Sequence, residues 1–148
     1  MIVKVIIEQE GNVLERLQQG MNRGFSYYRQ DLKNYSELGC YDRLSDLWNL
    51  ETLTEGDIRS SGYVVHTLEA AIWSLINASS YEETVLKAVN LGDDTDTVGA
   101  VTGGLAGLYY GYDSIPKKWI NTMQRRDWVW KKLSQGNWYN FLFLCDFC

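Results

Sequence analysis

Three carboxylates and two hydroxyls occupy five consecutive positions of this 148-residue chain, in the run Asp93-Asp94-Thr95-Asp96-Thr97. Carboxylates this close repel one another unless a cation neutralises their charge. Oxygen side chains are the ligands that Mg²⁺, Mn²⁺ and Ca²⁺ prefer, so the run predicts a metal site. Because a helical pattern follows, the same side chains could instead cap a helix N-terminus. One acid and one hydroxyl are enough for a cap, and the crowding therefore favours the metal site.

Two other known motifs have a similar arrangement of residues. Residues 94–98 fit the D-x-D-x-[TV] pattern of aspartate-nucleophile phosphatases, but that pattern follows a buried strand, and residues 82–90 have a helical period. A calcium-binding EF-hand loop starting at Asp94 would place Val98 at a ligand position. It would also place Leu105 where a bidentate acid is needed. Neither alternative fits its context.

The elements that must position this run are predicted to be helices, and the fold class is all-α. Apolar residues recur at spacings of three and four, and the single proline, Pro116, agrees with long uninterrupted helices. Asn12 and Glu15 have the spacing of a capping box. Residues 1–7 are expected to form a strand or an apolar arm. Helices are predicted from Val13 to about Lys33, over 63–76, from Ser79 or Ser80 to Gly92, from about Asp94 to Tyr110, and from Pro116 onward.

The predicted helix over 94–110 contains four interior glycines, Gly99, Gly103, Gly104 and Gly107. Each costs a helix about 1 kcal/mol relative to alanine. We therefore expect this helix to lie in the middle of a bundle, with neighbouring backbones tight against it. The predicted buried stripes are Val98, Val101, Leu105 and Leu108 on this helix, Val85, Leu86, Ala88 and Val89 on the preceding one, and Ile115, Trp119, Ile120 and Met123 around the last.

The charge pattern argues against nucleic-acid and membrane partners. The formal net charge is −5 and the pI is about 4.8, which opposes binding to nucleic acid or an anionic membrane. No apolar run approaches the ~20 residues that span a bilayer. The first residues lack the features of a signal peptide, so a cytoplasmic location is expected. Lysines and arginines of residues 117–132 alternate with tryptophans, and we expect a solvated basic face with the aromatic rings in the core.

Two ordered blocks of the chain resemble the ADP-ribosylglycohydrolase family. The first is Ser61-Gly62-Tyr63-Val64-Val65-His66-Thr67-Leu68-Glu69-Ala70-Ala71. The second is Asn90-Leu91-Gly92-Asp93-Asp94-Thr95-Asp96-Thr97, followed by Gly103-Gly104-Leu105-Ala106-Gly107. The order and spacing of the blocks make the resemblance specific. It extends from about Leu14 to Leu133, and the motif-bearing region is 61–111.

The resemblance implies a multi-helix orthogonal bundle with a binuclear metal centre, usually Mg²⁺ and sometimes Mn²⁺. It implies hydrolysis of the bond between the ribose anomeric carbon of ADP-ribose and a protein side chain or small leaving group. The implied metal ligands are Asp94, Asp96 and Thr97. The family commonly has glycine where this chain has Asp93, so Asp93 is expected outside the metal shell, near the substrate. Tyr63 is similar to a residue that stacks on adenine, Ser61 and Gly62 would line the same cleft, and His66 would be structural or a substrate contact.

The resemblance covers only the C-terminal half of the family. The N-terminal half carries a Thr-Asp-Asp or Ser-Asp-Asp run and an early catalytic acid, whereas Asp31, Asp42, Asp46 and Asp57 are isolated acids here. Residues 1–148 are therefore expected to form one incomplete domain, inactive alone, that is completed by an N-terminal half or that self-associates to cover apolar surface. The partner would be ADP-ribose or an ADP-ribosylated protein. A remnant that binds ADP-ribose without catalysis, and a purely structural helical domain, are the alternative hypotheses.

Overall fold

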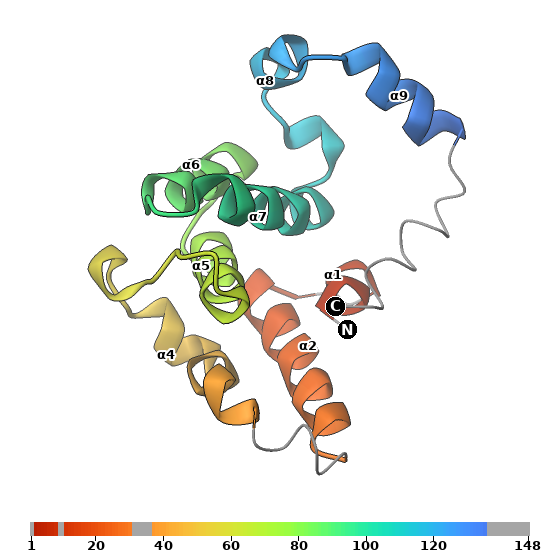
Figure 1. Cartoon of the computed structure of the whole chain (residues 1–148). Helices are drawn as coiled ribbons and strands as arrows, with labels where there is room; N and C mark the ends of the chain where they lie inside the picture. The colour runs from red at the N-terminus through yellow and green to blue at the C-terminus, as the bar shows by residue number, and fades with distance from the viewer. Residues whose placement is uncertain (1, 9–10, 31–36, 136–148) are drawn as a thin grey trace. The chain divides into compact units, whose positions relative to one another are not determined.

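The protein was analysed as a computed structural model, which describes residues 2–8, 11–30 and 37–135. Every regular element in these ranges is a helix, which confirms the all-α prediction (Figure 1). Backbone contacts divide the chain into two units, residues 1–115 and 116–148, and each is described by itself. The expectation of one incomplete domain stays a prediction. The first unit contains α1 (Ile2–Glu8), α2 (Val13–Tyr28), the 3-10 helix η1 (Leu38–Ser45), α4 (Leu47–Glu51), the 3-10 helix η2 (Glu55–Asp57), α5 (Val64–Ile76), α6 (Tyr81–Asn90), α7 (Thr95–Tyr110) and the 3-10 helix η3 (Tyr112–Ser114).

The prediction of a strand or an apolar arm at the N-terminus is wrong, because residues 2–8 form helix α1. Its valines and isoleucines favour a strand locally, but such propensities are weak compared with tertiary packing. Val5 and Ile6 are buried, and α1 packs closely on α2. A side chain at Gly20 of α2 would place its Cβ 3.0 Å from the Ile2 Cα. Glycine at this position therefore permits the close approach of the two helices.

Helix α2 begins with the predicted capping box. The Glu15 amide donates to Asn12 Oδ1 at 2.9 Å, and the Asn12 amide donates to Glu15 Oε2 at 3.4 Å. These bonds satisfy two of the donors that a helix N-terminus leaves free. The helix ends at Tyr28, earlier than the predicted Lys33.

Replacing Asn12 by Ala is expected to lower the free energy of unfolding by about 1 kcal/mol, because the capping bond to the Glu15 amide is lost. Urea unfolding measures the difference. The matched control is Gln19→Ala on the exposed side of the same helix, which should change stability by less than about 0.5 kcal/mol. Equal stability of Asn12→Ala and the control would contradict a stabilising cap.

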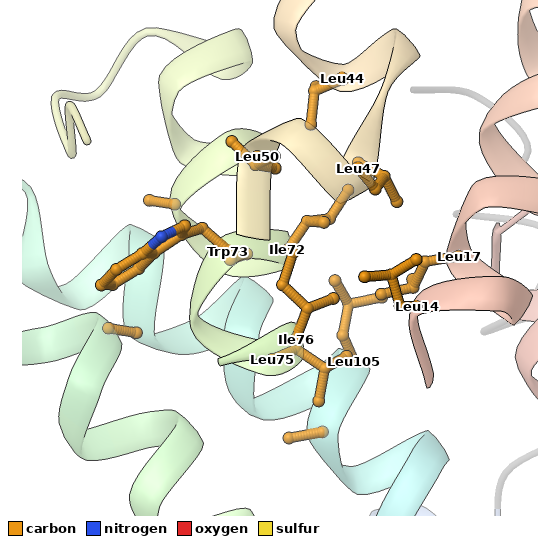
Figure 2. Packing of buried hydrophobic residues seen from close by; sticks show 14 of the residues in the cluster. Leu14, Leu17, Leu44, Leu47, Leu50, Ile72, Trp73, Leu75, Ile76 and Leu105 are labelled. Atoms are coloured by element: carbon orange, nitrogen blue, oxygen red, sulfur yellow. The ribbon is translucent and has the colours of Figure 1, made fainter. Parts of the chain in front are cut away.

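The core is built around α5, in which every residue from Glu69 to Ile76 is buried. Figure 2 shows Ile72, Leu75 and Ile76 of this helix amid leucines of α2, η1, α4 and α7. A helix that is apolar nearly all round must be enclosed by others. The enclosed element is thus α5, and not the glycine-rich helix for which this position was predicted. The labelled leucines around it are Leu14, Leu17, Leu44, Leu47, Leu50 and Leu105.

Helix α7 packs mainly against α5 and α6 and also contacts α1, while Thr97, Ala100, Val101, Gly104 and Leu108 are exposed. Two of its glycines have close neighbours. A Cβ added at Gly99 would lie 3.0 Å from Val89 Cγ1, and one added at Gly103 would lie 3.3 Å from the Tyr81 hydroxyl oxygen. These neighbours are side chains of α6, so the prediction of tight backbones is wrong here. Nothing lies within 4 Å of a Cβ at Gly104.

Two predicted apolar stripes are only partly buried. On α6 the buried residues are Thr84 and Ala88, while Leu86 is exposed. On α7, Val101 and Leu108 are exposed. Helical periodicity gives the direction of an apolar face but not its width, and small residues fill the contacts where two helices lie close. The buried residues of α7 are Val98, Thr102, Leu105 and Ala106.

The second unit contains α8 (Lys117–Thr122) and α9 (Arg126–Gln135). Helix α8 begins directly after Pro116, as predicted. None of its residues is buried, and Met123 is exposed, so the prediction of buried positions there is wrong. Trp128 and Trp130 are also exposed rather than in the core. Two short helices offer little apolar surface for large rings to pack against. None of the described helices is long and apolar enough to cross a membrane.

Candidate functional site

The loop before α5 and the turn before α7 meet, although they lie in different motif blocks. The Ser60 hydroxyl donates to the Gly92 carbonyl at 3.0 Å, and the Asp94 amide donates to the Ser60 carbonyl at 3.1 Å. A Cβ at Gly62 would lie only 2.6 Å from Asp94 Oδ2. The backbone at residue 62 therefore lies against the Asp94 carboxylate, and a side chain there would displace it.

The turn that carries the acidic run has two consecutive left-handed residues. Gly92 has φ +83° and Asp93 has φ +59°. Glycine adopts this region freely, and aspartate is among the few other residues that tolerate it. The turn redirects the chain from α6 into α7 and leaves the Asp93 side chain exposed. A glycine, which the family resemblance implies at this position, would adopt this backbone freely.

Asp94 occupies the N-cap position of α7, yet its side chain accepts no capping hydrogen bond. Its carboxyl group instead lies beside that of Asp96. This contact, together with the Thr97 amide that donates to Asp96 Oδ1 at 3.0 Å, holds the pKa of Asp96 below its usual range. Capping therefore does not explain why Asp94 is an acid.

The acidic turn fits part of the coordination shell of a hard cation. Asp94 is half-buried, while Asp96 and Thr97 are exposed in the first turn of α7. Their carboxylate and hydroxyl oxygens suit Mg²⁺ or Mn²⁺. No three His, Cys, Asp or Glu side chains of the described residues lie close enough to form a metal site. The described residues thus offer two carboxylates for a cation, and not a complete cage.

The facing loop presents Ser61 and Tyr63. Tyr63 immediately precedes α5, and its side chain is 49% exposed. A hydrogen bond with the Cys40 thiol of η1 raises the pKa of the Tyr63 hydroxyl. The Ser61 hydroxyl shares a hydrogen bond of 2.7 Å with His66 Nδ1. The Thr67 hydroxyl donates to the Ser61 and Tyr63 carbonyls at 3.3 and 3.4 Å. The first turn of α5 thereby anchors this loop.

Comparison with known proteins covers nearly the whole chain. The profile of the ADP-ribosylglycohydrolase family matches residues 1–141. This chain belongs to the ADP-ribosylglycohydrolase family.

Individual relatives match over shorter ranges. The chain is 49% identical over 71 residues to an ADP-ribosylarginine hydrolase Tri1 of Serratia proteamaculans. This match covers 48% of this chain and 19% of the relative. It is 51% identical over 63 residues to the protein of the same name from Pseudomonas putida, and this match covers 43% of this chain and 17% of the relative. It is 34% identical over 68 residues to an ADP-ribosyl-[dinitrogen reductase] glycohydrolase of Rhodospirillum rubrum, and this match covers 46% of this chain and 23% of the relative. The matches thus span about a fifth of the length of these ADP-ribosylglycohydrolases.

The ADP-ribosylglycohydrolase motifs supply all seven predicted site residues, and the fold brings them to one region. Sequence reasoning missed Cys40 and Thr67, which hold the Ser61–Tyr63 loop. Thr67 lies within the first motif block, four residues after Tyr63, and this helical spacing is a signal that could have found it. Nothing in the pattern around Cys40 indicates that η1 lies beside Tyr63.

A hollow of about 420 Å³ lies beside η2 and α6. None of the predicted site residues lines it. Its lining is Glu55, Ser80, Glu82, Glu83, Leu86, Lys87 and Asn90.

An ion pair between a buried carboxylate and an exposed guanidinium lies one helical turn beyond His66. Glu69 is 4% exposed, and Arg43 Nη1 lies 3.1 Å from its Oε1. Burial raises the pKa of Glu69 above its ordinary value of 4.5, while the positive charge of Arg43 and interaction with His66 lower it to a smaller extent. The folded chain therefore binds this proton more tightly than the unfolded chain does.

Glu69→Gln is expected to gain stability relative to the original chain as the pH rises above about 4.5, until the pH passes the folded-state pKa. Over that window the folded original chain must give up a proton that it holds tightly, and the glutamine variant has no such proton. Urea unfolding at several pH values between 4 and 8 measures the trend.

Glu83→Gln provides a control of opposite sign. The Ser79 amide and hydroxyl, at 2.8 and 2.7 Å, lower the pKa of Glu83, so its carboxylate stabilises the fold at higher pH. The Glu83→Gln variant should therefore lose stability relative to the original chain as the pH rises towards about 4.5, and should show no further trend above it. Parallel trends for the two variants would contradict the prediction for Glu69.

Proposed function

We propose that this chain forms part of the site of an ADP-ribosyl hydrolase. In this proposal Asp94, Asp96 and Thr97 hold Mg²⁺ or Mn²⁺, and the Ser61–Tyr63 loop with Asp93 contacts the ADP-ribose portion of the substrate. The observation that supports it most is the Asp94 carboxylate, which caps no helix, meets Asp96 and lies against Gly62. The names of the relatives support a substrate that carries ADP-ribose on a protein.

The chemistry of the reaction suits these residues. Cleavage of the bond at the ribose anomeric carbon develops positive charge on the sugar, which nearby carboxylates stabilise. Bound divalent cations lower the pKa of water and orient hydroxyl groups. Asp94 and Asp96 would supply the negative charge that holds these cations. The half-exposed Tyr63 ring offers a face for stacking on adenine, and Ser61 offers a hydroxyl for hydrogen bonding.

Further ligands are needed for full activity. Two carboxylates and one hydroxyl cannot fill the shells of two six-coordinate ions. We therefore propose that another polypeptide segment supplies the remaining oxygen ligands, and that the described residues alone do not turn over substrate. Thr97, Val101, Gly104 and Leu108 lie at helical spacing on the exposed side of α7. A segment that reaches the ions would cover this face, or a second copy of the chain would.

Calorimetric titration of ADP-ribose into the chain, with and without Mg²⁺, tests the proposal. Binding that strengthens with Mg²⁺ is the expected result. Binding without turnover of an ADP-ribosylated protein would agree with an incomplete site, and turnover restored by an added N-terminal half would agree with a divided enzyme. Absence of binding under both conditions would contradict the proposal and favour a purely structural helical domain.

Mg²⁺ is expected to raise the Tm of the original chain but not that of Asp94→Asn or Asp96→Asn. An ion that binds only the folded state stabilises it by about 1.4 kcal/mol at ten times its Kd, and thereby raises the Tm by a few degrees. Asparagine keeps the side-chain volume and removes the charge. Asp113→Asn, an exposed acid on η3, is the control and should keep the full rise. A rise that persists in both site variants would contradict the ligand assignment.

A further inference from the structure

Both side chains that the loop before α5 offers to a ligand contact the same imidazole. His66 Nδ1 lies 2.7 Å from the Ser61 hydroxyl. The His66 ring also meets the Tyr63 ring edge to face, with centroids 5.1 Å apart and an angle of 85° between the planes. Such edge-to-face pairs favour one relative orientation of the two rings. His66 therefore constrains the Ser61 hydroxyl and the Tyr63 ring together.

The position of His66 is itself well defined. It lies half-buried in the first turn of α5, the most enclosed helix of the described chain. Its neighbour Thr67 is buried and holds the carbonyls of Ser61 and Tyr63. Glu69, one turn further, is buried and paired with Arg43. Backbone and side chains of the loop are thus tied to one rigid turn.

We infer that His66 is a positioning residue of the ligand-binding loop. Its Nδ1 fixes the orientation of the Ser61 hydroxyl, and its ring fixes the orientation of the Tyr63 ring, before the ligand binds. The inference rests on the proposed function for the identity of the ligand, ADP-ribose. Without the Nδ1 contact the Ser61 side chain is free to populate other rotamers, and ordering it would then weaken ligand binding. A histidine that only filled space would not couple to Ser61.

Two measurements on the ligand-free chain test the contact. His66 is the single histidine of the chain, so its ring ¹⁵N resonances are assigned without ambiguity. Ser61→Ala is expected to shift the Nδ1 resonance, while the control Ser79→Ala, which removes a hydroxyl bonded to Glu83, should leave it unchanged. The Tyr63 amide donates to the Ser61 hydroxyl at 3.4 Å. His66→Phe frees that hydroxyl to turn away, and should therefore speed hydrogen exchange of the Tyr63 amide by about two- to tenfold, the effect of one lost hydrogen bond. An unshifted Nδ1 resonance, or unchanged exchange, would overturn the inference.

Binding of ADP-ribose separates positioning from a merely structural role. His66→Phe keeps a flat ring beside Tyr63 but lacks Nδ1, and should weaken binding by about two- to tenfold, as Ser61→Ala should. The double variant should bind no more weakly than either single variant, because both remove the same contact. His66→Asn, whose amide can replace Nδ1, should restore binding. Additive losses, or no rescue by asparagine, would overturn the inference.

The two proposals fail in different ways. An original chain that does not bind ADP-ribose contradicts the proposed function, and the ligand-free resonance and exchange measurements then decide whether His66 positions the loop. If the original chain and the His66→Phe variant bind ADP-ribose equally well, the proposed function stands and the positioning role of His66 is contradicted.

Discussion

Gly62→Ala is expected to abolish the response of the chain to Mg²⁺ while leaving the fold intact. The added methyl would lie 2.6 Å from Asp94 Oδ2, a separation that no real contact of this kind shows. The carboxylate is the end of a side chain and can rotate away, so the free energy of unfolding should fall by only about 1 kcal/mol or less. The displaced oxygen is, in the proposed function, a metal ligand. Melting curves with and without Mg²⁺, and the amide NMR shifts of Asp94 and Asp96, measure the two effects.

Gly104→Ala is the matched control for an added methyl. It lies on α7, where no atom is within 4 Å of the new Cβ, so the carboxylates keep their places. Its Tm should rise slightly, since alanine favours a helix over glycine by about 1 kcal/mol. Unchanged shifts at Asp94 in Gly62→Ala would contradict the contact between the two motif blocks, whether or not the original chain binds Mg²⁺.

Trp73→Ala should cause the largest loss of stability of any single change considered, about 3–5 kcal/mol. The indole of Trp73 is only 4% exposed, and its Nε1 donates to the Leu53 carbonyl at 3.0 Å. Lys87 of α6 lies over the ring, with Nζ 5.3 Å from its centroid. Truncation leaves a cavity and an unpaired carbonyl at the same time. A domain of this size is stable by about 5–15 kcal/mol, so this loss would remove a large share of its stability.

Trp48→Ala removes the same side chain from the surface. Trp48 lies on α4 and is 53% exposed, so its truncation should cost about 1 kcal/mol or less. Urea unfolding of the two tryptophan variants gives the comparison. A similar loss in both would mean that Trp73 does not anchor α5 to its neighbours as the structure indicates.

Local sequence signals gave correct predictions where neighbouring residues decide the structure. Asn12 and Glu15 form the predicted capping box, because both partners lie within one turn. Pro116 precedes α8, because proline fixes its own backbone and lacks the donor that a helix start does not use. Helical periodicity located α5, α6 and α7 to within a few residues.

The same signals failed where distant elements decide. Residues 2–8 carry strand-favouring side chains but form a helix on α2. Val101 and Leu108 fit an apolar stripe, yet the face that they share is exposed. Trp128 and Trp130 are also exposed, although large aromatic rings are usually buried. Hydrophobic periodicity indicates which face of a helix is apolar, but it does not indicate whether another element covers that face.

The sequence by itself determined which side chains are available for chemistry and that they lie at helix ends, since both follow from residue type and spacing. Only the tertiary structure decided that Gly62 lies against Asp94, and that Cys40 of η1 reaches Tyr63. It also decided that Asp94 meets Asp96 instead of capping α7. The contacts of Gly62 with Asp94 and of Cys40 with Tyr63 depend on how η1, α5 and α7 pack around a shared core, and no local pattern encodes the distance between residues that packing brings together.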